Sequence, residues 1–106
     1  MNIGIDVVSL NKFRHTRKSH YRYWNRIFTV REWEYAFKNS HSAEHLAGMF
    51  AAKEATMKAL RRVGVGEFKK IEVLHTKFGE PRVNKKGCKV SISHDTSIAF
   101  SVVLVV

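Results

Sequence analysis

The chain has 106 residues, which is enough for one domain but not comfortably for two. It carries 19 Lys and Arg against 9 Asp and Glu, so its formal net charge is +10, and 44% of its residues are hydrophobic. This composition excludes global disorder, and no apolar run approaches the roughly 18–20 residues that span a bilayer. The first residues lack the pattern of a signal peptide, and the single Cys88 excludes an intrachain disulfide, so we expect a cytosolic protein.

The charge predicts an acidic partner, which could be nucleic acid, an anionic membrane, a phosphorylated cofactor or an acidic protein. A core of this size is also marginal by itself, which favours an oligomer.

The first two thirds of the chain predict one strand followed by helices. Residues 2–8 are apolar and largely β-branched, as in a strand, and Ser9 can cap a following helix. Thr29 and Glu32 form a capping box, and the stretch after residue 43 is rich in good helix formers. The predicted helices therefore begin after Ser9, after Thr29 and at Ala43, and they end near Lys18, Lys38 and Arg62.

The last third has the character of a β meander. Short runs of β-branched and apolar residues alternate with turn residues such as Gly, Pro and Asp. The predicted strands cover residues 68–76, 82–84, 88–94 and 98–106. This order of elements predicts an α+β fold in which residues 1–106 form a single domain, with an N-terminal strand, one long central helix and an antiparallel β meander.

Basic and aromatic residues alternate between Lys12 and Arg31, where Asp and Glu are absent until Glu32. One interpretation is a surface for single-stranded nucleic acid, which such alternation suits through stacking and phosphate contacts. The other is a solvated face whose aromatic residues belong to the core. The seven basic residues are Lys12, Arg14, Arg17, Lys18, Arg22, Arg26 and Arg31.

Asp6 lies inside an otherwise apolar strand. Alternation places it on the same face as Gly4 and Val8. A carboxylate there costs free energy unless it is paired, hydrated or bound to a cation. Asp6 therefore either caps the next helix or belongs to a functional site.

The long helix carries charges within its apolar stripe. Phe50 and Met57 share this stripe with Lys53, and Glu54 lies at its edge, one turn before Lys58. Glu54 and Lys58 could form an ordinary solvent-exposed ion pair. They could instead be a metal ligand beside a phosphate-binding lysine, and two carboxylates would suit Mg²⁺.

His94 ends a predicted strand beside small hydroxyl residues. It could contact phosphate, although a lone histidine is often structural. Cys88, with no partner at metal spacing, is expected to be a small buried hydrophobic residue.

Several segments, taken together and in this order, resemble the holo-acyl-carrier-protein synthases, the short single-domain type of 4′-phosphopantetheinyl transferase. The resemblance runs nearly end to end. It rests on four segments: Gly4-Ile5-Asp6-Val7-Val8, the helix segment from Leu46 to Ala55 (LAGMFAAKEA), Ile71-Glu72-Val73-Leu74-His75 with Gly79-Glu80-Pro81, and Val90-Ser91-Ile92-Ser93-His94-Asp95.

The resemblance implies a homotrimer with active sites between neighbouring subunits. It also implies transfer of 4′-phosphopantetheine from coenzyme A to a serine of an acyl carrier protein, with release of adenosine 3′,5′-bisphosphate. Asp6 and Glu54 match the ligands of Mg²⁺, and Lys58 matches the lysine that binds phosphate. The expected catalytic residues are thus Asp6, Glu54 and Lys58. The base is Glu54 or a metal-bound water that it orients.

The same resemblance assigns the remaining contacts. Coenzyme A is expected to bind Lys58, Arg61, Gly64, Gly66, Ser93 and His94, with Lys53 and Arg62 as further partners of its phosphates. The acidic carrier protein is expected to dock on Lys12, Arg14, Arg17, Arg22 and Arg26. No nucleic acid or membrane partner is expected.

The chain departs from the family pattern at two places. Met49 stands where the family usually has Arg, and Arg61-Arg62-Val63 precede the expected glycines. These departures leave open a weakened homologue that binds coenzyme A or carrier protein without efficient catalysis. The segment from Lys12 to Arg31 leaves open a second alternative, a basic nucleic-acid-binding module.

Overall fold

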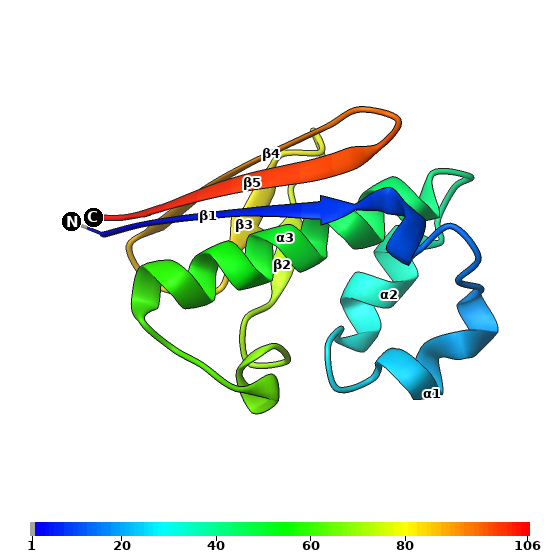
Figure 1. The fold of residues 1–106 in the computed structure, drawn as a ribbon, viewed down its shortest axis with the longest axis horizontal. Coiled ribbons are helices and arrows are strands. Elements are labelled where there is room, and N and C mark those ends of the chain that lie inside the picture. Colours follow the sequence, from blue (N-terminus) through cyan, green and yellow to red (C-terminus); the bar gives the residue numbers. More distant parts are fainter. Residues whose placement is uncertain (1) are drawn as a thin grey trace.

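A three-stranded antiparallel sheet and one long helix dominate the computed structural model, which describes residues 2–106 (Figure 1). The sheet has the order β1-β5-β4, with β1 at Asn2–Ser9, β4 at Cys88–His94 and β5 at Ile98–Val105. Asn2 pairs with Val105, so the two ends of the chain lie side by side. The N-terminal strand therefore depends on the last strand of the chain for its hydrogen bonds.

The predicted meander is divided between two sheets. The short strands β2 (Val73–His75) and β3 (Pro81–Val83) pair with each other in a separate hairpin. The strand predicted over residues 68–76 is present only as β2, and its first part was wrong because residues 67–71 close successive turns. In these turns the backbone N–H of Lys70 donates to Glu67 and that of Ile71 to Phe68.

Ser9 caps a helix as predicted, but this helix is only the 3-10 turn η1 (Leu10–Lys12) and does not reach Lys18. Hydrogen bonds to the β4–β5 turn hold this region. The backbone N–H of Leu10 donates to the carbonyl of Ser97, and the side chain of Arg14, just after η1, donates to the carbonyl of Thr96. The chain then forms the 3-10 turn η2 (Lys18–His20) and the single turn α1 (Tyr21–Trp24).

The two later helices follow the sequence more closely. The capping box of Thr29 and Glu32 is present at the start of α2 (Val30–Ala36), which ends two residues before Lys38. The predicted long helix is α3 (Ser42–Leu60), followed by the 3-10 turn η3 (Val65–Glu67). None of the helices in the described chain has the length and apolar character needed to cross a membrane.

Helix α3 packs directly on β1 through Gly4. A Cβ built at Gly4 would lie 1.9 Å from the carbonyl oxygen of Ala55. Only glycine permits this approach, because the obstacle is helix backbone and cannot rotate away. The aromatic residues of the basic segment largely join the core on the same side of the sheet: Phe13 and Phe28 are fully buried and Trp24 packs against them.

The opposite face of the sheet carries no helix (Figure 1). Ile3, Ile5 and Val7 of β1 point to this face and are 66%, 51% and 54% exposed. They pair across the sheet with Leu104, Val102 and Phe100 of β5. We call these six side chains the open sheet face. Cys88 is half-buried rather than fully buried, because it lies at the first position of β4, near the end of the sheet.

Candidate functional site

Two carboxylates meet where β1 crosses α3. Asp6 is in the middle of β1, on the face that packs against α3, and Glu54 is on α3. Asp6 does not cap the next helix, because Ser9 has that role. Its Oδ2 atom is buried and has no hydrogen-bond partner. The structure therefore brings together two acidic residues that are 48 positions apart in the sequence, with a buried, unpartnered oxygen of Asp6 between β1 and α3.

Lys58 lies beside the carboxylates. Its ammonium group is 3.3 Å from Asp6 Oδ1 and 2.9 Å from the carbonyl oxygen of Ile5. The exposed Glu54–Lys58 ion pair considered from the sequence is not among the ion pairs of residues 2–106, because Lys58 turns toward β1 instead. Since 57% of the Lys58 side chain is exposed, it can also reach an anion in solvent.

Burial and the nearby Asp6 carboxylate raise the pKa of Glu54 above its usual value. The Lys12 and Lys58 ammonium groups oppose this increase and lower that pKa. Lys12 also lies over the ring of Phe50, with its nitrogen 4.1 Å from the ring centroid. Two cations thus act on one carboxylate pair, and the sequence alone did not identify Lys12 as a neighbour of Glu54.

A groove of about 570 Å³ opens beside Glu54 and Lys58. Its lining combines apolar side chains, including Met57, Val65 and Phe68, with the basic residues Arg61 and Arg62. Gly64 is in the same groove, and Gly66 lines an adjoining cavity with Arg26 and Lys69. Such a groove can hold a long flexible ligand that has an anionic part and an apolar part.

Arg61 has an unusual backbone conformation at the end of α3. Its φ of 57° makes it the only non-glycine residue with positive φ in the described chain. Helices commonly end in this left-handed conformation, but usually with glycine, because a Cβ is crowded there. An arginine at this position therefore places a cation in the groove at a cost in stability.

We expect Arg61→Gly to raise the free energy of unfolding by about 1 kcal/mol, because glycine relieves this crowding. Urea denaturation of the purified variants measures the effect. Arg62→Gly is the matched control: Arg62 is the next residue and has an ordinary φ, so glycine there should give no gain. A loss of stability in Arg61→Gly would contradict the expectation.

The structure contradicts the suggestion that Lys53 serves a phosphate. Its side chain is fully buried and forms an ion pair with Glu32, with 2.7 Å between Nζ and Oε1. The helical stripe predicted that Lys53 faces the core, but it did not identify the partner. The sequence identified Glu32 only as a capping residue of α2. In the structure Glu32 both caps α2 and pairs with Lys53.

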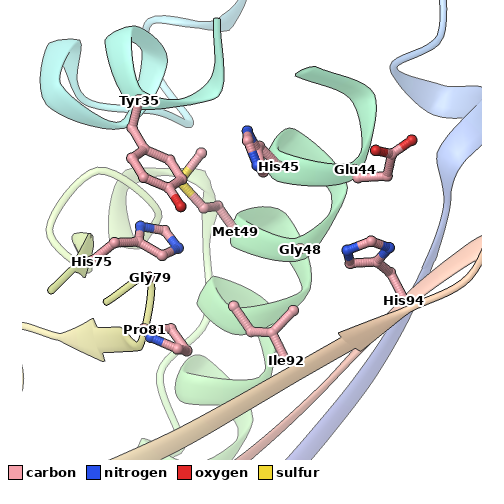
Figure 2. A pocket seen from close by; sticks show the side chains of 10 residues that line it. All are labelled: Tyr35, Glu44, His45, Gly48, Met49, His75, Gly79, Pro81, Ile92 and His94. Atoms are coloured by element: carbon pink, nitrogen blue, oxygen red, sulfur yellow. The ribbon is translucent and has the colours of Figure 1, made fainter. Parts of the chain in front are cut away.

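Ser93 and His94 lie elsewhere in the same chain. His94 lines a second cavity, of about 220 Å³, with Glu44, Gly48, Met49 and Pro81 (Figure 2). Ser93 lines an adjacent exposed depression. Neither residue lines the groove that contains Lys58. Within one chain, the predicted coenzyme A residues are therefore divided between two places.

Aromatic and imidazole rings form part of the second cavity, and sequence reasoning did not identify them as a group. Tyr35 and His75 stack with their ring centroids 3.8 Å apart, and His45 approaches Tyr35 from another side (Figure 2). Burial and the nearby His45 lower the pKa of His75 to about 4, so this imidazole is neutral near pH 7. These residues come from three different elements, so local sequence gives no sign that they meet.

The predicted docking residues are basic side chains of the segment between β1 and α2. Lys12, Arg14, Arg17, Arg22 and Arg26 are all exposed, while their aromatic neighbours are largely in the core. The arginine side chains have different neighbours. Arg14 donates hydrogen bonds to Asn11 and to the carbonyl of Thr96, whereas Arg22 lies against the exposed ring of Tyr23.

The residues at the carboxylate pair fit a hard divalent cation. Asp6 Oδ2 is buried and has no hydrogen-bond partner. Burial and the nearby Asp6 charge disfavour the ionised form of Glu54, and a cation would relieve the repulsion between the two carboxylates. Within residues 2–106 there is no group of three or more His, Cys, Asp or Glu that could hold a metal. Mg²⁺ does not need one, since it commonly uses one or two carboxylates and completes its shell with water and substrate phosphates.

Comparison with known families identifies the class of protein. Residues 2–103 match the model of the 4′-phosphopantetheinyl transferase superfamily, and the chain belongs to this superfamily. It is therefore an enzyme of the transferase class, and its α+β fold is that of the family.

Its relatives place it among the holo-acyl-carrier-protein synthases. It is 38% identical to the holo-[acyl-carrier-protein] synthase of Caldicellulosiruptor bescii, over 97% of this chain and 95% of that protein. A Bacillus anthracis holo-(acyl-carrier-protein) synthase, crystallised in complex with CoA (3′,5′-ADP), is 33% identical with a TM-score of 0.81, over 98% and 94% of the two chains. The Helicobacter pylori enzyme in complex with coenzyme A is 27% identical with a TM-score of 0.80, over 98% and 99%.

Proposed function

We propose that this enzyme transfers 4′-phosphopantetheine from coenzyme A to a serine of an apo-acyl carrier protein and releases adenosine 3′,5′-bisphosphate. The observation that carries the proposal is the half-buried Asp6–Glu54 carboxylate pair, with Lys58 beside it, at the edge of an apolar and basic groove. The relatives named above are synthases of this kind, and two of them were crystallised with coenzyme A or a part of it.

The proposed reaction is a displacement at phosphorus. The serine oxygen of the carrier protein forms a bond to the β-phosphorus of coenzyme A, and the bond from that phosphorus to the bridging oxygen breaks. The leaving group is adenosine 3′,5′-bisphosphate. Lys58 offsets the charge that develops on the leaving phosphate, and Glu54 is the carboxylate that would accept the serine proton.

Asp6 and Glu54 are the residues that would hold Mg²⁺. When bound, Mg²⁺ neutralises the pyrophosphate and makes its phosphorus more electrophilic. The support for this assignment is the buried oxygen of Asp6 that has no partner, together with its carboxylate neighbour.

Mass spectrometry tests the proposed transfer. The purified protein is incubated with coenzyme A, Mg²⁺ and a panel of apo-carrier proteins. We expect a carrier to gain the mass of one phosphopantetheine, and omission of Mg²⁺ to prevent the gain. Binding of coenzyme A without any mass gain would instead support the weakened homologue. Oligonucleotide binding with a steep salt dependence and no transfer would support the nucleic-acid module.

We also propose that the active form is a homotrimer assembled through the open sheet face. Three of the six apolar side chains of this face, Ile3, Ile5 and Val7, are exposed and the three on β5 are half-buried, and large exposed apolar patches mark interaction sites. Assembly would also explain the division of the coenzyme A residues, because a second copy could supply Ser93 and His94 to the groove of the first. The number of copies rests on the family resemblance.

We expect Ile3→Asp to dissociate the assembly, because it would bury a charge in an apolar interface. Light scattering on the eluting protein should show about three times 12.2 kDa for the unchanged chain and close to 12.2 kDa for the variant. Val30→Asp is the control, since Val30 is 55% exposed but lies on α2, away from the sheet. An Ile3→Asp variant of unchanged mass would show that assembly uses another surface.

A further inference from the structure

Lys53 forms a fully satisfied buried cation next to the candidate active site. Its ammonium group donates to Glu32 at 2.7 Å, to the carbonyl oxygen of Phe68 at 2.8 Å and to that of Ile71. Both Lys53 and Glu32 have no exposed side-chain surface. An ammonium group has three protons, and here each has an acceptor. The proposed chemistry uses neither Lys53 nor Glu32.

The Lys53–Glu32 pair joins three separate parts of the chain. Glu32 accepts hydrogen bonds from the backbone N–H of Thr29, at 2.8 Å, and of Val73, at 2.7 Å. Lys53 is on α3 and Glu32 is on α2, and the carbonyls that Lys53 binds belong to the segment between η3 and β2. The pair thereby fixes this segment against both helices.

That segment continues into one wall of the groove. We call residues 63–68 the groove wall, since Val63, Gly64, Val65 and Phe68 line the groove. In the described chain, the bond from Lys53 to Phe68 is the only hydrogen bond that links the groove wall to α3 or to a strand. The ring of Phe68 adds an apolar contact, with its centroid 5.2 Å from that of Phe50. The groove wall is otherwise largely exposed.

Lys53 also precedes Glu54 directly in α3. Because consecutive residues of a helix have a fixed geometry, the backbone positions of Lys53 and Glu54 do not move relative to each other. Lys53 holds the groove wall, and Glu54 is the carboxylate of the site. The two side chains leave the helix in different directions, Lys53 toward α2 and Phe68, and Glu54 toward Asp6.

We propose that Lys53, held by Glu32, is a positioning residue that fixes the groove wall relative to Glu54 and so determines the affinity for coenzyme A. The inference rests on the proposed function. If the groove wall were free to move, it would have to be ordered each time coenzyme A bound, and this entropy would be lost from binding. The carboxylates and Lys58 would keep their places, because they are on β1 and α3.

The test compares the unchanged enzyme with the double variant Lys53→Met/Glu32→Gln. This variant removes all three bonds donated by Lys53 without leaving an unpaired buried charge. We expect KM for coenzyme A to rise about tenfold or more, while kcat changes by less than about threefold. Hydrogen exchange should become faster in the groove wall than in β1 or β5.

Three results would overturn the proposal. One is an unchanged KM in a folded double variant, and another is a fall in kcat alone. The third is a double variant that does not fold, since the pair would then serve global stability.

Lys86→Met, in the exposed turn before β4, is the control for loss of one lysine. Lack of transfer by the unchanged enzyme would count against the proposed function instead, and calorimetry with coenzyme A would still test the position of the groove wall.

Discussion

Glu54→Gln and Asp6→Asn should each lower kcat by at least about 10³-fold while leaving the protein folded. Each substitution keeps the shape of the side chain but removes one charge from the carboxylate pair. Burial and the neighbouring Asp6 carboxylate both disfavour the charged form of Glu54, so Glu54→Gln should not lower the melting temperature. The transfer assay and a thermal melt of the same samples measure both effects.

Mg²⁺ and pH give two readouts that do not depend on activity. Mg²⁺ should raise the melting temperature of the unchanged protein and not that of Glu54→Gln, because a ligand stabilises the state that binds it. The pKa of Glu54 is raised on folding, so the folded state retains this proton to higher pH than the unfolded chain does. Stability should therefore fall as pH rises from about 4.5 through the raised value, and Glu54→Gln should remove this part of the pH dependence.

These measurements can separate the two acidic residues. Retained turnover in either variant would remove that residue from the site. A variant that loses its folded structure would show that the carboxylate is stabilising, in contradiction to the repulsion that we infer.

Gly4→Ala should lower the free energy of unfolding by roughly 3 kcal/mol or more. The added Cβ would lie 1.9 Å from the carbonyl oxygen of Ala55 and 2.8 Å from the backbone nitrogen of Ala59. Both are backbone atoms of α3, so β1 itself must move. Since β1 carries Asp6, the same displacement should separate Asp6 from Glu54 and abolish turnover. Urea denaturation and the transfer assay measure the two effects.

Gly66→Ala is the matched control for stability. A Cβ at Gly66 would meet nothing within 4 Å, and its φ is not in the left-handed range. The free energy of unfolding should therefore change by no more than about 0.5 kcal/mol. If Gly4→Ala were equally mild, the close packing of β1 on α3 would not be needed to hold the two carboxylates together.

Local patterns in the sequence predicted most of the elements correctly. The capping box at Thr29, the long helix and the strands from Cys88 and from Ile98 are all present, because each depends on residues close together in the chain. The errors fall where distant contacts decide the backbone. The helix after Ser9 stops after one turn, where Leu10 is bound to Ser97, and the strand predicted at residue 68 is replaced by turns whose carbonyls bind Lys53.

By itself, the sequence determined the fold class, the alternation that turns Asp6 toward the core side of β1, and the motifs that place the chain in its family. These features are periodic or consecutive, so a single chain read in order contains them. Only the tertiary structure decided which charged residues work together. It paired Lys53 with Glu32, brought Asp6 to Glu54, set Lys12 over Phe50 and separated His94 from Lys58. The physical reason is that charges interact through space, and their energy depends on burial and distance, which no spacing along the chain specifies.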